Sequence, residues 1–344
     1  MNWSNQISKP VTVVVDAMGG DYAPLEIVKG ALLAARELDI KVILTGKEAE
    51  IRTILDKEKA CCNANIEVID APEDIPMDEK NPAKAVRRAK NSSVVVANRL
   101  VAEGKADAVV AAGNTGAATA ASLFGLGRID GFERPCICTI IPTIQSKMFL
   151  IDGGSNIETT PEQMVQSAII GSILAKILFG KTNPKVGLLN IGEEEGKGTE
   201  RYKETYDLLK VEPRINFIGN VEGKTIIDDI CDIAICDGFT GNIHLKSLEG
   251  GLKAMAAAIQ AQVKHSGPIE LIGGLLLKFS GAFDRIKNHF HPNSFGGALL
   301  GGVNGVSIIS HGSSNAEAIK NACKHAKLLV ENKVIEEIKK NFAD

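Results

Sequence analysis

Residues 11–21 read VTVVVDAMGGD, and this stretch decides the fold because it joins a β-branched run directly to a polar, glycine-rich turn. A continuous run such as Val11–Val15 is typical of a strand that is buried on both faces of a sheet. Pro24 follows the turn at a position where a first helical turn tolerates proline, and apolar residues then recur at helical spacing from Leu25 to Ala35. The stretch therefore predicts a strand, a turn and a helix.

The same succession of apolar run and polar turn recurs along the chain. Six such turns are Asp16–Asp21, Gly113–Ala117, Asp152–Asn156, Asn190–Glu200, Asp237–Asn242 and His311–Ser314. In an open α/β sheet, strand-to-helix junctions lie together at the carboxyl ends of the strands, where backbone N–H groups and helix N-termini hold an anion. The sequence thus predicts a cleft for a small phosphate-like ligand.

The remaining pattern predicts a mainly parallel, helix-covered sheet, that is, a three-layer α/β/α fold. Further strands are expected at 41–44, 66–69, 108–112, 136–141, 148–151, 185–190, 215–218, 233–236 and 306–309. Helices are expected at 48–59 and 161–179, and a single long helix at 82–103. Because no fixed-period repeat or low-complexity linker is present, we expect one α/β domain over residues 11–335. Residues 1–10 are expected to form a disordered extension and residues 336–344 a tail.

The composition favours an enzyme and argues against nucleic acid as a partner. The 344 residues are enough to bury a large core, and 44% are hydrophobic while only 4% are aromatic. The formal net charge of -3 gives no basic footprint. Seven cysteines, an odd number, and a polar N-terminus without an apolar signal core favour reduced thiols in the cytoplasm. We also expect no run long and apolar enough to span a bilayer.

The glycine-rich segments do not match nucleotide-binding motifs. Gly192–Thr199 approaches a P-loop, but its first glycine is one residue too close to Lys197, and no Ser or Thr directly follows the lysine. Gly125, Gly127 and Gly131 have the wrong final spacing for G-x-G-x-x-G. A Walker-type ATPase and a nicotinamide dehydrogenase are therefore disfavoured.

Two polar residues in the turns are candidates for chemistry. Glycines flank Lys197, so backbone and ammonium can approach one anion together, although a solvated loop lysine is the alternative. Asn242 either caps a helix that begins near Ile243 or aims its amide at a developing oxyanion. Asp16 and Asp237 end apolar strands, and because a carboxylate repels phosphate, we favour an orienting role for both.

Cysteines and histidines give weaker signals. Cys136, Cys138, Cys231 and Cys236 lie in or beside apolar strands with no apparent histidine partner, which favours buried structural thiols. His289 and His291 form an H-x-H pair without carboxylate or cysteine companions, so we predict no metal site there.

The segment 269–291 combines an apolar helical stripe with local positive charge. Its residues include Leu275, Leu276, Phe279 and Phe283, together with Lys278, Arg285 and Lys287. Core packing is one interpretation. The added basicity also fits a segment that meets a membrane surface or an acidic protein.

Taken together, the motifs closely resemble those of the bacterial phosphate acyltransferase family called PlsX. They are DAMGGD at 16–21, GNTGA at 113–117, NIGEEE at 190–195 with Lys197 and Gly198, GNVE at 219–222, DGFTGN at 237–242 and HGSS at 311–314. The resemblance runs from about residue 11 to about residue 330. It departs at 152–156, which reads DGGSN where the family pattern is nearer DVGAN.

This resemblance implies that inorganic phosphate attacks the thioester of a fatty acyl group on acyl carrier protein, giving acyl phosphate for phospholipid synthesis. It also implies a fold related to phosphotransacetylases and to isocitrate- and isopropylmalate-type dehydrogenases, a homodimer, and no metal or organic cofactor. An acyl-CoA-dependent phosphotransacetylase and a non-catalytic ligand-binding regulator of lipid synthesis are the alternatives.

The expected chemistry assigns roles to the candidate residues. Because phosphate is already nucleophilic, the protein must hold two anionic substrates in line and stabilise an oxyanion. We expect Lys197 to offset negative charge and Asn242 to donate to the thioester oxygen. The predicted phosphate- or substrate-binding residues are Asp16, Gly19, Gly20, Gly113, Asn114, Thr115, Asp237, Thr240, His311 and Ser313.

The product would be an amphiphile destined for a membrane glycerol-3-phosphate acyltransferase. We therefore expect the segment 269–291 to contact carrier protein, membrane or both. The protein is expected to be cytoplasmic and peripherally membrane-associated.

Overall fold

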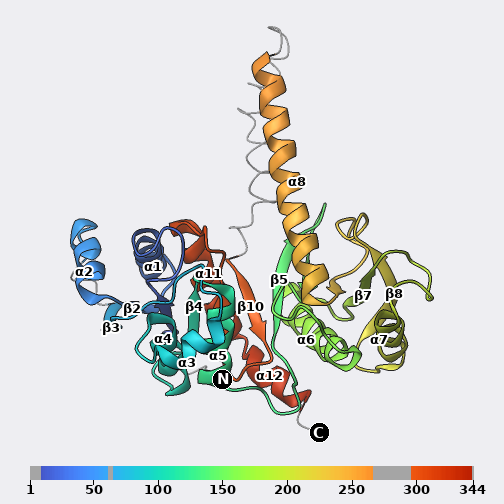
Figure 1. Ribbon diagram of the computed structural model, residues 1–344, viewed down its shortest axis with the longest axis horizontal. Helices are drawn as coiled ribbons and strands as arrows, with labels where there is room; N and C mark the ends of the chain where they lie inside the picture. Colours follow the sequence, from blue (N-terminus) through green and yellow to red (C-terminus); the bar gives the residue numbers. More distant parts are fainter. Residues whose placement is uncertain (1–8, 61–64, 266–295, 343–344) are drawn as a thin grey trace, which may run out of the picture. The chain divides into compact units, whose positions relative to one another are not determined.

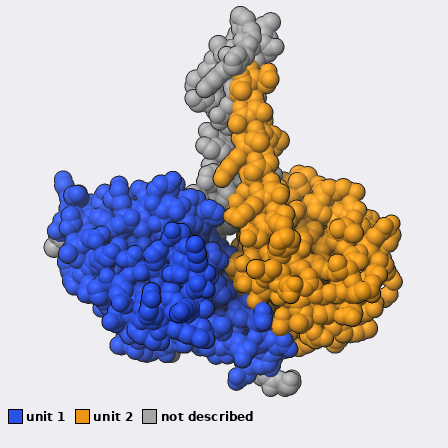
Figure 2. Space-filling model, viewed as in Figure 1, with its two compact units in different colours: residues 1–135, 296–344 blue, residues 136–295 orange. Residues whose placement is uncertain are grey.

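The computed structural model describes residues 9–60, 65–265 and 296–342, and their contacts form two compact units (Figures 1 and 2). Unit 1 comprises residues 1–135 and 296–344, and unit 2 comprises residues 136–295. Unit 1 is therefore assembled from two separate stretches of the chain, with unit 2 inserted between them.

The sheet of unit 1 has the strand order β3-β2-β1-β4-β11-β10. Its strands are β1 (Thr12–Asp16), β2 (Lys41–Gly46), β3 (Ile66–Asp70), β4 (Ala108–Ala111), β10 (Ala298–Gly301) and β11 (Val306–Ile309). All neighbours are parallel except β10, which runs antiparallel to β11. Every residue of β1, β4 and β11 is buried, as expected for strands that are covered on both faces.

Helices cover both faces of this sheet (Figure 1). On one face α1 (Leu25–Glu37) packs against α11 (Ala316–Glu331), and α2 (Glu48–Lys57) lies beside α1. The other face carries α3 (Pro82–Arg88), α4 (Ser93–Ala102) and α5 (Thr115–Leu126). There Val96 and Leu100 of α4 join Val14 and Val109 of the sheet in one buried cluster. A short helix, α12 (Val334–Lys340), follows α11.

The sheet of unit 2 has the strand order β5-β6-β9-β7-β8. Its strands are β5 (Cys136–Pro142), β6 (Lys147–Ile151), β7 (Lys185–Asn190), β8 (Asn216–Glu222) and β9 (Ile233–Ile235). β5 is antiparallel to β6, and the other pairs are parallel.

In unit 2, α6 (Pro161–Phe179) and α7 (Glu200–Val211) pack together on one face of the sheet. Leu245 and Leu248, near the start of α8 (Gly238–His265), pack on a separate core cluster that includes Met148 and Ala234. Thus strands and helices alternate as the sequence predicted, and the expected α/β fold with helices on both sides of a mostly parallel sheet is confirmed.

α6 shows how local signals set the bounds of a helix. Thr160 Oγ1 accepts from the Gln163 N–H at 3.3 Å, and Gln163 Oε1 accepts from the Thr160 N–H at 3.1 Å, which forms a capping box. Pro161 opens the helix, and Gly180, with φ of 66°, ends it. The sequence predicted both ends.

The helix α6 also tests the expectation that no segment is long and apolar enough to span a bilayer. Among the described residues, it is the one helix that is long and apolar enough to cross a membrane, so that expectation was too strict. However, 61% of its apolar window is buried within the protein. It therefore has the character of a core helix.

One sequence prediction is wrong, one strand was missed, and two predicted segments lie largely or wholly outside the described residues. The single helix at 82–103 is wrong, because α3 ends at Arg88 and α4 begins at Ser93. β10 was missed, since its apolar run is short and flanked by glycines. The expected N-terminal extension lies largely outside the described residues, and the segment 269–291 lies wholly outside them.

Candidate functional site

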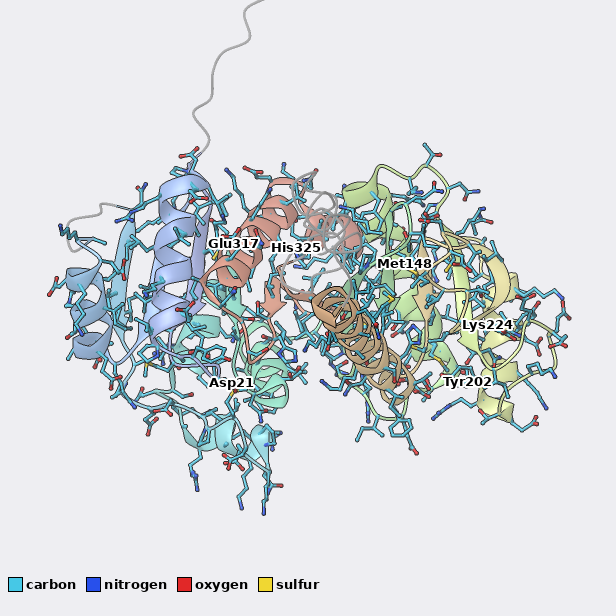
Figure 3. All side chains as sticks on the ribbon, turned by 90° about the horizontal axis from the view of Figure 1, so that it is seen from above. Asp21, Met148, Tyr202, Lys224, Glu317 and His325 are labelled. Atoms are coloured by element: carbon cyan, nitrogen blue, oxygen red, sulfur yellow. The ribbon has the colours of Figure 1, made fainter. Side chains whose placement is uncertain are left out.

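All six polar turns lie at strand-to-helix junctions, three in each unit (Figure 3, where Asp21 marks unit 1 and Tyr202 marks unit 2). In unit 1 they follow β1, β4 and β11, which are adjacent and parallel. In unit 2 they follow β6, β9 and β7, which are also adjacent and parallel. Because parallel strands end at one edge of a sheet, the three turns of each unit gather there.

In unit 1 the turns touch through their backbones. The Asp21 N–H donates to the Gly312 carbonyl at 2.8 Å. A Cβ on Gly19 would lie only 2.7 Å from Asp16 Oδ2 and 2.8 Å from the Gly113 nitrogen. The turn at 16–21 and the turn at 113–117 can therefore approach this closely only because residue 19 is glycine. The niche between them measures about 10 Å³, which leaves room for about one water molecule.

Asp16 lies buried at the edge of this niche. Burial raises the pKa of its carboxyl to about 6, although hydrogen bonds from Ser93 and from the Met18 N–H oppose the shift. Asp16 therefore gains or loses a proton at mildly acidic to neutral pH, and its orienting role stays a prediction.

Among the other predicted residues of unit 1, Asn114 and Thr115 lie at the start of α5, and His311 and Ser313 lie in the turn before α11. Asn114 caps α5, since its Oδ1 accepts from the Ala117 N–H at 3.0 Å, and its Nδ2 donates to the Met77 carbonyl at 2.8 Å. Thr115 is the first residue of α5, so its N–H has no acceptor within the helix. His311 Nδ1 lies 2.8 Å from Ser313 Oγ within their own exposed turn. A phosphate-binding role for these groups stays a prediction.

In unit 2 the Asp152 carboxylate organises the turn after β6, a role that the sequence did not reveal. Its Oδ1 accepts from the backbone N–H groups of Ile137, Gly154 and Ser155 at 2.9 to 3.0 Å. Its Oδ2 accepts from the Asn156 N–H and Nδ2, both at 2.9 Å, and from Ser155 Oγ at 2.6 Å. Six donors thus fix this turn, five of them within it and the sixth, the Ile137 N–H, from β5.

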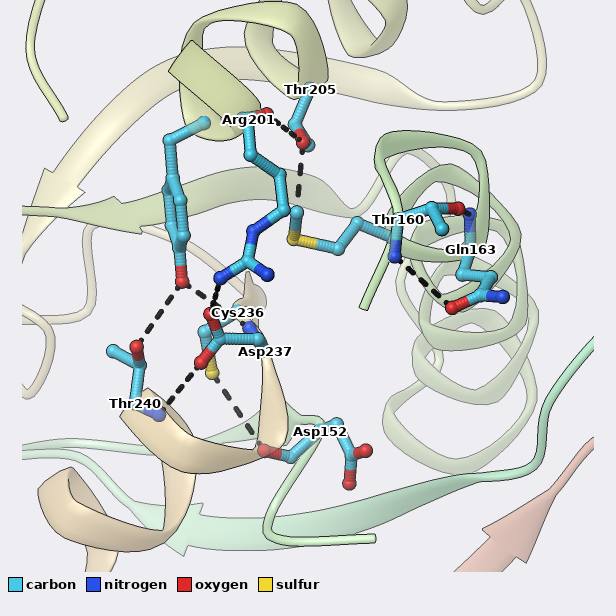
Figure 4. Close-up of polar contacts among 10 residues, drawn as sticks. Asp152, Thr160, Gln163, Arg201, Thr205, Cys236, Asp237 and Thr240 are labelled. Carbon is cyan, nitrogen blue, oxygen red and sulfur yellow. Dashed lines mark hydrogen bonds and ion pairs between the residues drawn. The ribbon is translucent and has the colours of Figure 1, made fainter. Parts of the chain in front are cut away.

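Asp237 connects the turn after β9 to α7 and α8 (Figure 4). Its Oδ1 accepts from the Thr240 N–H at 2.8 Å, and its Oδ2 pairs with Arg201 Nη2 at 2.8 Å. The Tyr202 hydroxyl accepts from the Asp237 N–H and donates to Thr240 Oγ1, both at 3.3 Å. Because burial raises the pKa of Tyr202 to about 12, this hydroxyl stays protonated. Asp237 therefore links Arg201 of α7 to Thr240 of α8, and its predicted orienting role toward a ligand stays a prediction.

Asn242 does not cap a helix, which corrects one of the two interpretations given above. α8 begins at Gly238, and Asp237 supplies the capping oxygen. The Asn242 side chain instead lies against Gly154, where a Cβ would come within 3.2 Å of Asn242 Cγ. Within residues 9–60, 65–265 and 296–342, the Asn242 amide has no hydrogen-bond partner, so it is free to meet a ligand oxygen.

Lys197 lies on a loop that two asparagines anchor. Asn190 Nδ2 donates to the Lys197 carbonyl and to Asn220 Oδ1, both at 3.1 Å. Asn220 Nδ2 donates to the Glu194 carbonyl at 2.7 Å. The Lys197 side chain is 48% exposed, and its Nζ lies 3.8 Å from Glu194 Oε2. The backbone of the loop is therefore held while the ammonium stays accessible.

The predicted site residues are thus divided between the units. Lys197, Asp237, Thr240 and Asn242 belong to unit 2, and the other described ones belong to unit 1. No hydrogen bond or ion pair among the described residues joins Lys197 to Asn242. The predicted contact residues Leu275, Leu276, Lys278, Phe279, Phe283, Arg285 and Lys287 lie outside the described residues, as do His289 and His291.

The described cysteines are buried, in line with structural thiols. Burial raises the pKa of Cys231 to about 12 and that of Cys236 well above its usual range. A thiol with so high a pKa is a poor nucleophile at neutral pH. In the described part of the chain, no group of three or more His, Cys, Asp or Glu residues is arranged to hold a metal.

Comparison with solved structures supports the fold. A phosphotransacetylase from Streptococcus pyogenes matches with a TM-score of 0.61 at 19% identity, covering 96% of this chain and 95% of that protein. A protein assigned as a 4-hydroxythreonine-4-phosphate dehydrogenase, from Salmonella typhimurium, matches with a TM-score of 0.52 at 13% identity, covering 93% of this chain and 99% of that protein. At such identities the likeness concerns the fold alone.

Comparison with known sequences is more specific. A family model described as "Fatty acid synthesis protein" matches residues 11–337. The phosphate acyltransferase of Desulfitobacterium hafniense is 49% identical over 331 residues, which cover 96% of this chain and 97% of the relative. That of Pelotomaculum thermopropionicum is 45% identical over 330 residues, covering 96% and 94%. The chain therefore belongs to the phosphate acyltransferase family, the family that its motifs resemble.

Proposed function

We propose that this protein transfers a long-chain fatty acyl group from the thioester of acyl carrier protein to inorganic phosphate, giving acyl phosphate for the synthesis of phosphatidic acid. Family membership supports acyl transfer to phosphate, and the description of the family supports a fatty acyl donor. The observation that carries the proposal lies in unit 2, where the accessible ammonium of Lys197 stands on an anchored loop and the side-chain amide of Asn242 has no hydrogen-bond partner among the described residues.

The proposed reaction needs no covalent intermediate on the protein. An oxygen of hydrogen phosphate forms a bond to the thioester carbon, and the C–S bond then breaks. The departing carrier thiolate takes up the proton that the phosphate carried, which gives acyl phosphate and the free carrier thiol. Lys197 offsets the charge of phosphate or of the tetrahedral oxyanion, and Asn242 donates a hydrogen bond to the former carbonyl oxygen. The burial of the described cysteines supports direct attack, because none of them is an accessible thiolate.

The identity of the donor is tested by product formation. The purified protein is incubated with phosphate and either palmitoyl carrier protein or palmitoyl-CoA, and acyl phosphate is quantified by mass spectrometry. We expect product from the carrier alone. Product from CoA alone would indicate a phosphotransacetylase-type enzyme, and no product from either would favour a ligand-binding regulator.

The catalytic roles are tested by Lys197→Ala and Asn242→Ala. Removal of one oxyanion donor typically costs about a hundredfold or more in rate, so we expect kcat to fall by at least that factor in each variant. Lys203→Ala is the matched control, because Lys203 is also a cation of unit 2 but pairs with Glu200 on α7. Near-normal turnover in a folded Lys197→Ala or Asn242→Ala variant would refute the assignment.

A membrane contact is the remaining part of the proposal. We place the reaction in the cytoplasm at the membrane surface, with a homodimer passing its amphiphilic product to a membrane acyltransferase. Its support is the apolar and basic composition of residues 269–291. Replacing Leu276 and Phe279 with Gln is expected to lower binding to anionic vesicles in a flotation assay. Undiminished flotation would argue that these residues pack within the protein instead.

A further inference from the structure

Unit 2 contains an elongated groove of about 640 Å³, a volume typical of small-molecule sites. Its walls come from the end of β7, the start of α7 and one face of α8. Five α8 residues line it: Phe239, and then Thr240, Ile243, His244 and Ser247, which occupy helical positions i, i+3, i+4 and i+7. Because these positions share one face and each residue rises about 1.5 Å, the groove follows α8 for about 10 Å.

The groove exposes apolar side chains that are usually covered. Ile191 is 81% exposed, Phe239 is 58% exposed and Ile243 is 52% exposed, and all three line the groove. Leu189 adds a buried apolar wall. A gathering of large apolar side chains at a concave surface indicates a site for an apolar ligand.

The groove also lacks charge. None of its lining residues is Asp, Glu, Lys or Arg. Burial lowers the pKa of His244, the one histidine that lines the groove, and so disfavours its charged form. An uncharged wall disfavours phosphate and the acidic surface of a protein, whereas an alkyl chain needs no charged partner.

One end of the groove meets the residues assigned to catalysis. Gly198 and Thr199, which line it, directly follow Lys197, and Asn190, another lining residue, holds the Lys197 carbonyl. Thr240 lies at the same end of α8, whereas Ser247 lies two turns further along.

We propose that this groove binds the alkyl chain of the acyl donor, with the thioester end near Gly198 and Thr240 and the methyl end toward Ser247. This inference deepens the proposed function and depends on it for the nature of the donor. It makes Ser247 a specificity-determining position, because a larger side chain there shortens the groove.

The first test compares Ser247→Phe with Lys246→Phe, since both positions are exposed on α8 and only Ser247 lines the groove. Acyl carrier protein is loaded with saturated chains of graded length. In the wild type, kcat/KM is expected to rise about fourfold for each methylene that enters the groove. Ser247→Phe is expected to lower kcat/KM at least tenfold for the longest chains and to leave the shortest unaffected. An unchanged length profile in Ser247→Phe, or the same loss in Lys246→Phe, would overturn the proposal.

The second test does not depend on turnover. A photoreactive palmitic acid is cross-linked to the full-length protein with and without excess palmitate, and the labelled peptides are identified by mass spectrometry. We expect competed labelling of peptides that contain Ile191 or residues 239–247, at least fivefold weaker in Ile191→Gln. Val211→Gln is the control, because Val211 is 74% exposed but does not line the groove.

The outcomes separate the two proposals. Competed labelling in the groove without acyl phosphate formation would support the groove and refute the enzymatic function. Acyl phosphate formation with labelling elsewhere, or with no competed labelling, would support the enzymatic function and refute the groove.

Discussion

Asp16 combines burial with a carboxyl group that titrates near neutral pH. Because the folded protein binds this proton more tightly than the unfolded chain does, ionisation of Asp16 lowers stability as the pH rises from about 4 to about 6. Asp16→Asn removes this ionisation, so the free energy of unfolding of the variant should gain up to about 3 kcal/mol relative to wild type across that interval.

This prediction is checked by urea unfolding of both proteins at several pH values from 4 to 7. Taking the difference between the proteins isolates Asp16 from carboxyls whose pKa is lowered, such as that of Glu212 beside Arg214. Parallel curves would show that the Asp16 carboxyl does not titrate in this range.

Single residues also show what sequence patterns can and cannot reveal. Asp16, Lys197 and Asp237 were predicted as site residues because each lies in or beside a glycine-rich turn. Arg201 and Tyr202 were missed, since nothing in their local sequence signals that β7 and β9 are neighbours, and that adjacency is what brings them to Asp237.

In unit 2, the N-terminal ends of helices α6 and α7 allow a controlled comparison of helix capping. Thr160 and Thr199 both occupy N-cap positions, but only the Thr160 side chain makes a capping hydrogen bond. Thr160→Ala should therefore lower the free energy of unfolding by about 1 kcal/mol. Thr199→Ala should lower it much less, and chemical denaturation measures both. Equal losses would mean that the capping box adds nothing at α6.

The interruption at 89–92 shows how tertiary contact overrides helical periodicity. Ser92 and Glu73 form an isolated parallel β-bridge, and the Ser93 N–H donates to the Glu73 carbonyl at 3.0 Å. The polar residues Asn91 and Ser92 favour such turns and caps. The helical periodicity of the sequence predicted one continuous helix through Asn91 and Ser92. It could not reveal the interruption, because Glu73, the partner in this pairing, is not close in sequence.

At the scale of the whole molecule, unit 1 depends on the last part of the chain. Truncation after residue 295 removes β11, the neighbour of β4, and α11, which packs on α1. We expect residues 1–135 of the truncated chain to become sensitive to protease while residues 136–265 stay protected. Limited proteolysis with mass spectrometry, compared with the full-length chain, measures this. Continued protection of residues 1–135 would show that they fold without the C-terminal stretch.

The sequence predicted the layers and all six junctions because both depend on short-range patterns. It gave no sign of the two compact units, since the division depends on which strands pair across long stretches of chain. The same truncation tests whether the two units unfold separately or as the single domain that the sequence predicts.

Because unit 1 consists of two separate stretches of the chain, it can be completed only late in protein synthesis. A ribosome adding roughly 5–20 residues per second needs on the order of ten seconds to make residues 136–295. For most of that time β4 has left the ribosome, but β11 does not yet exist to cover its open edge. During this interval the uncovered edge of the apolar strand β4 can associate with other chains. Binding of a chaperone to the nascent chain would therefore matter most at this stage of synthesis.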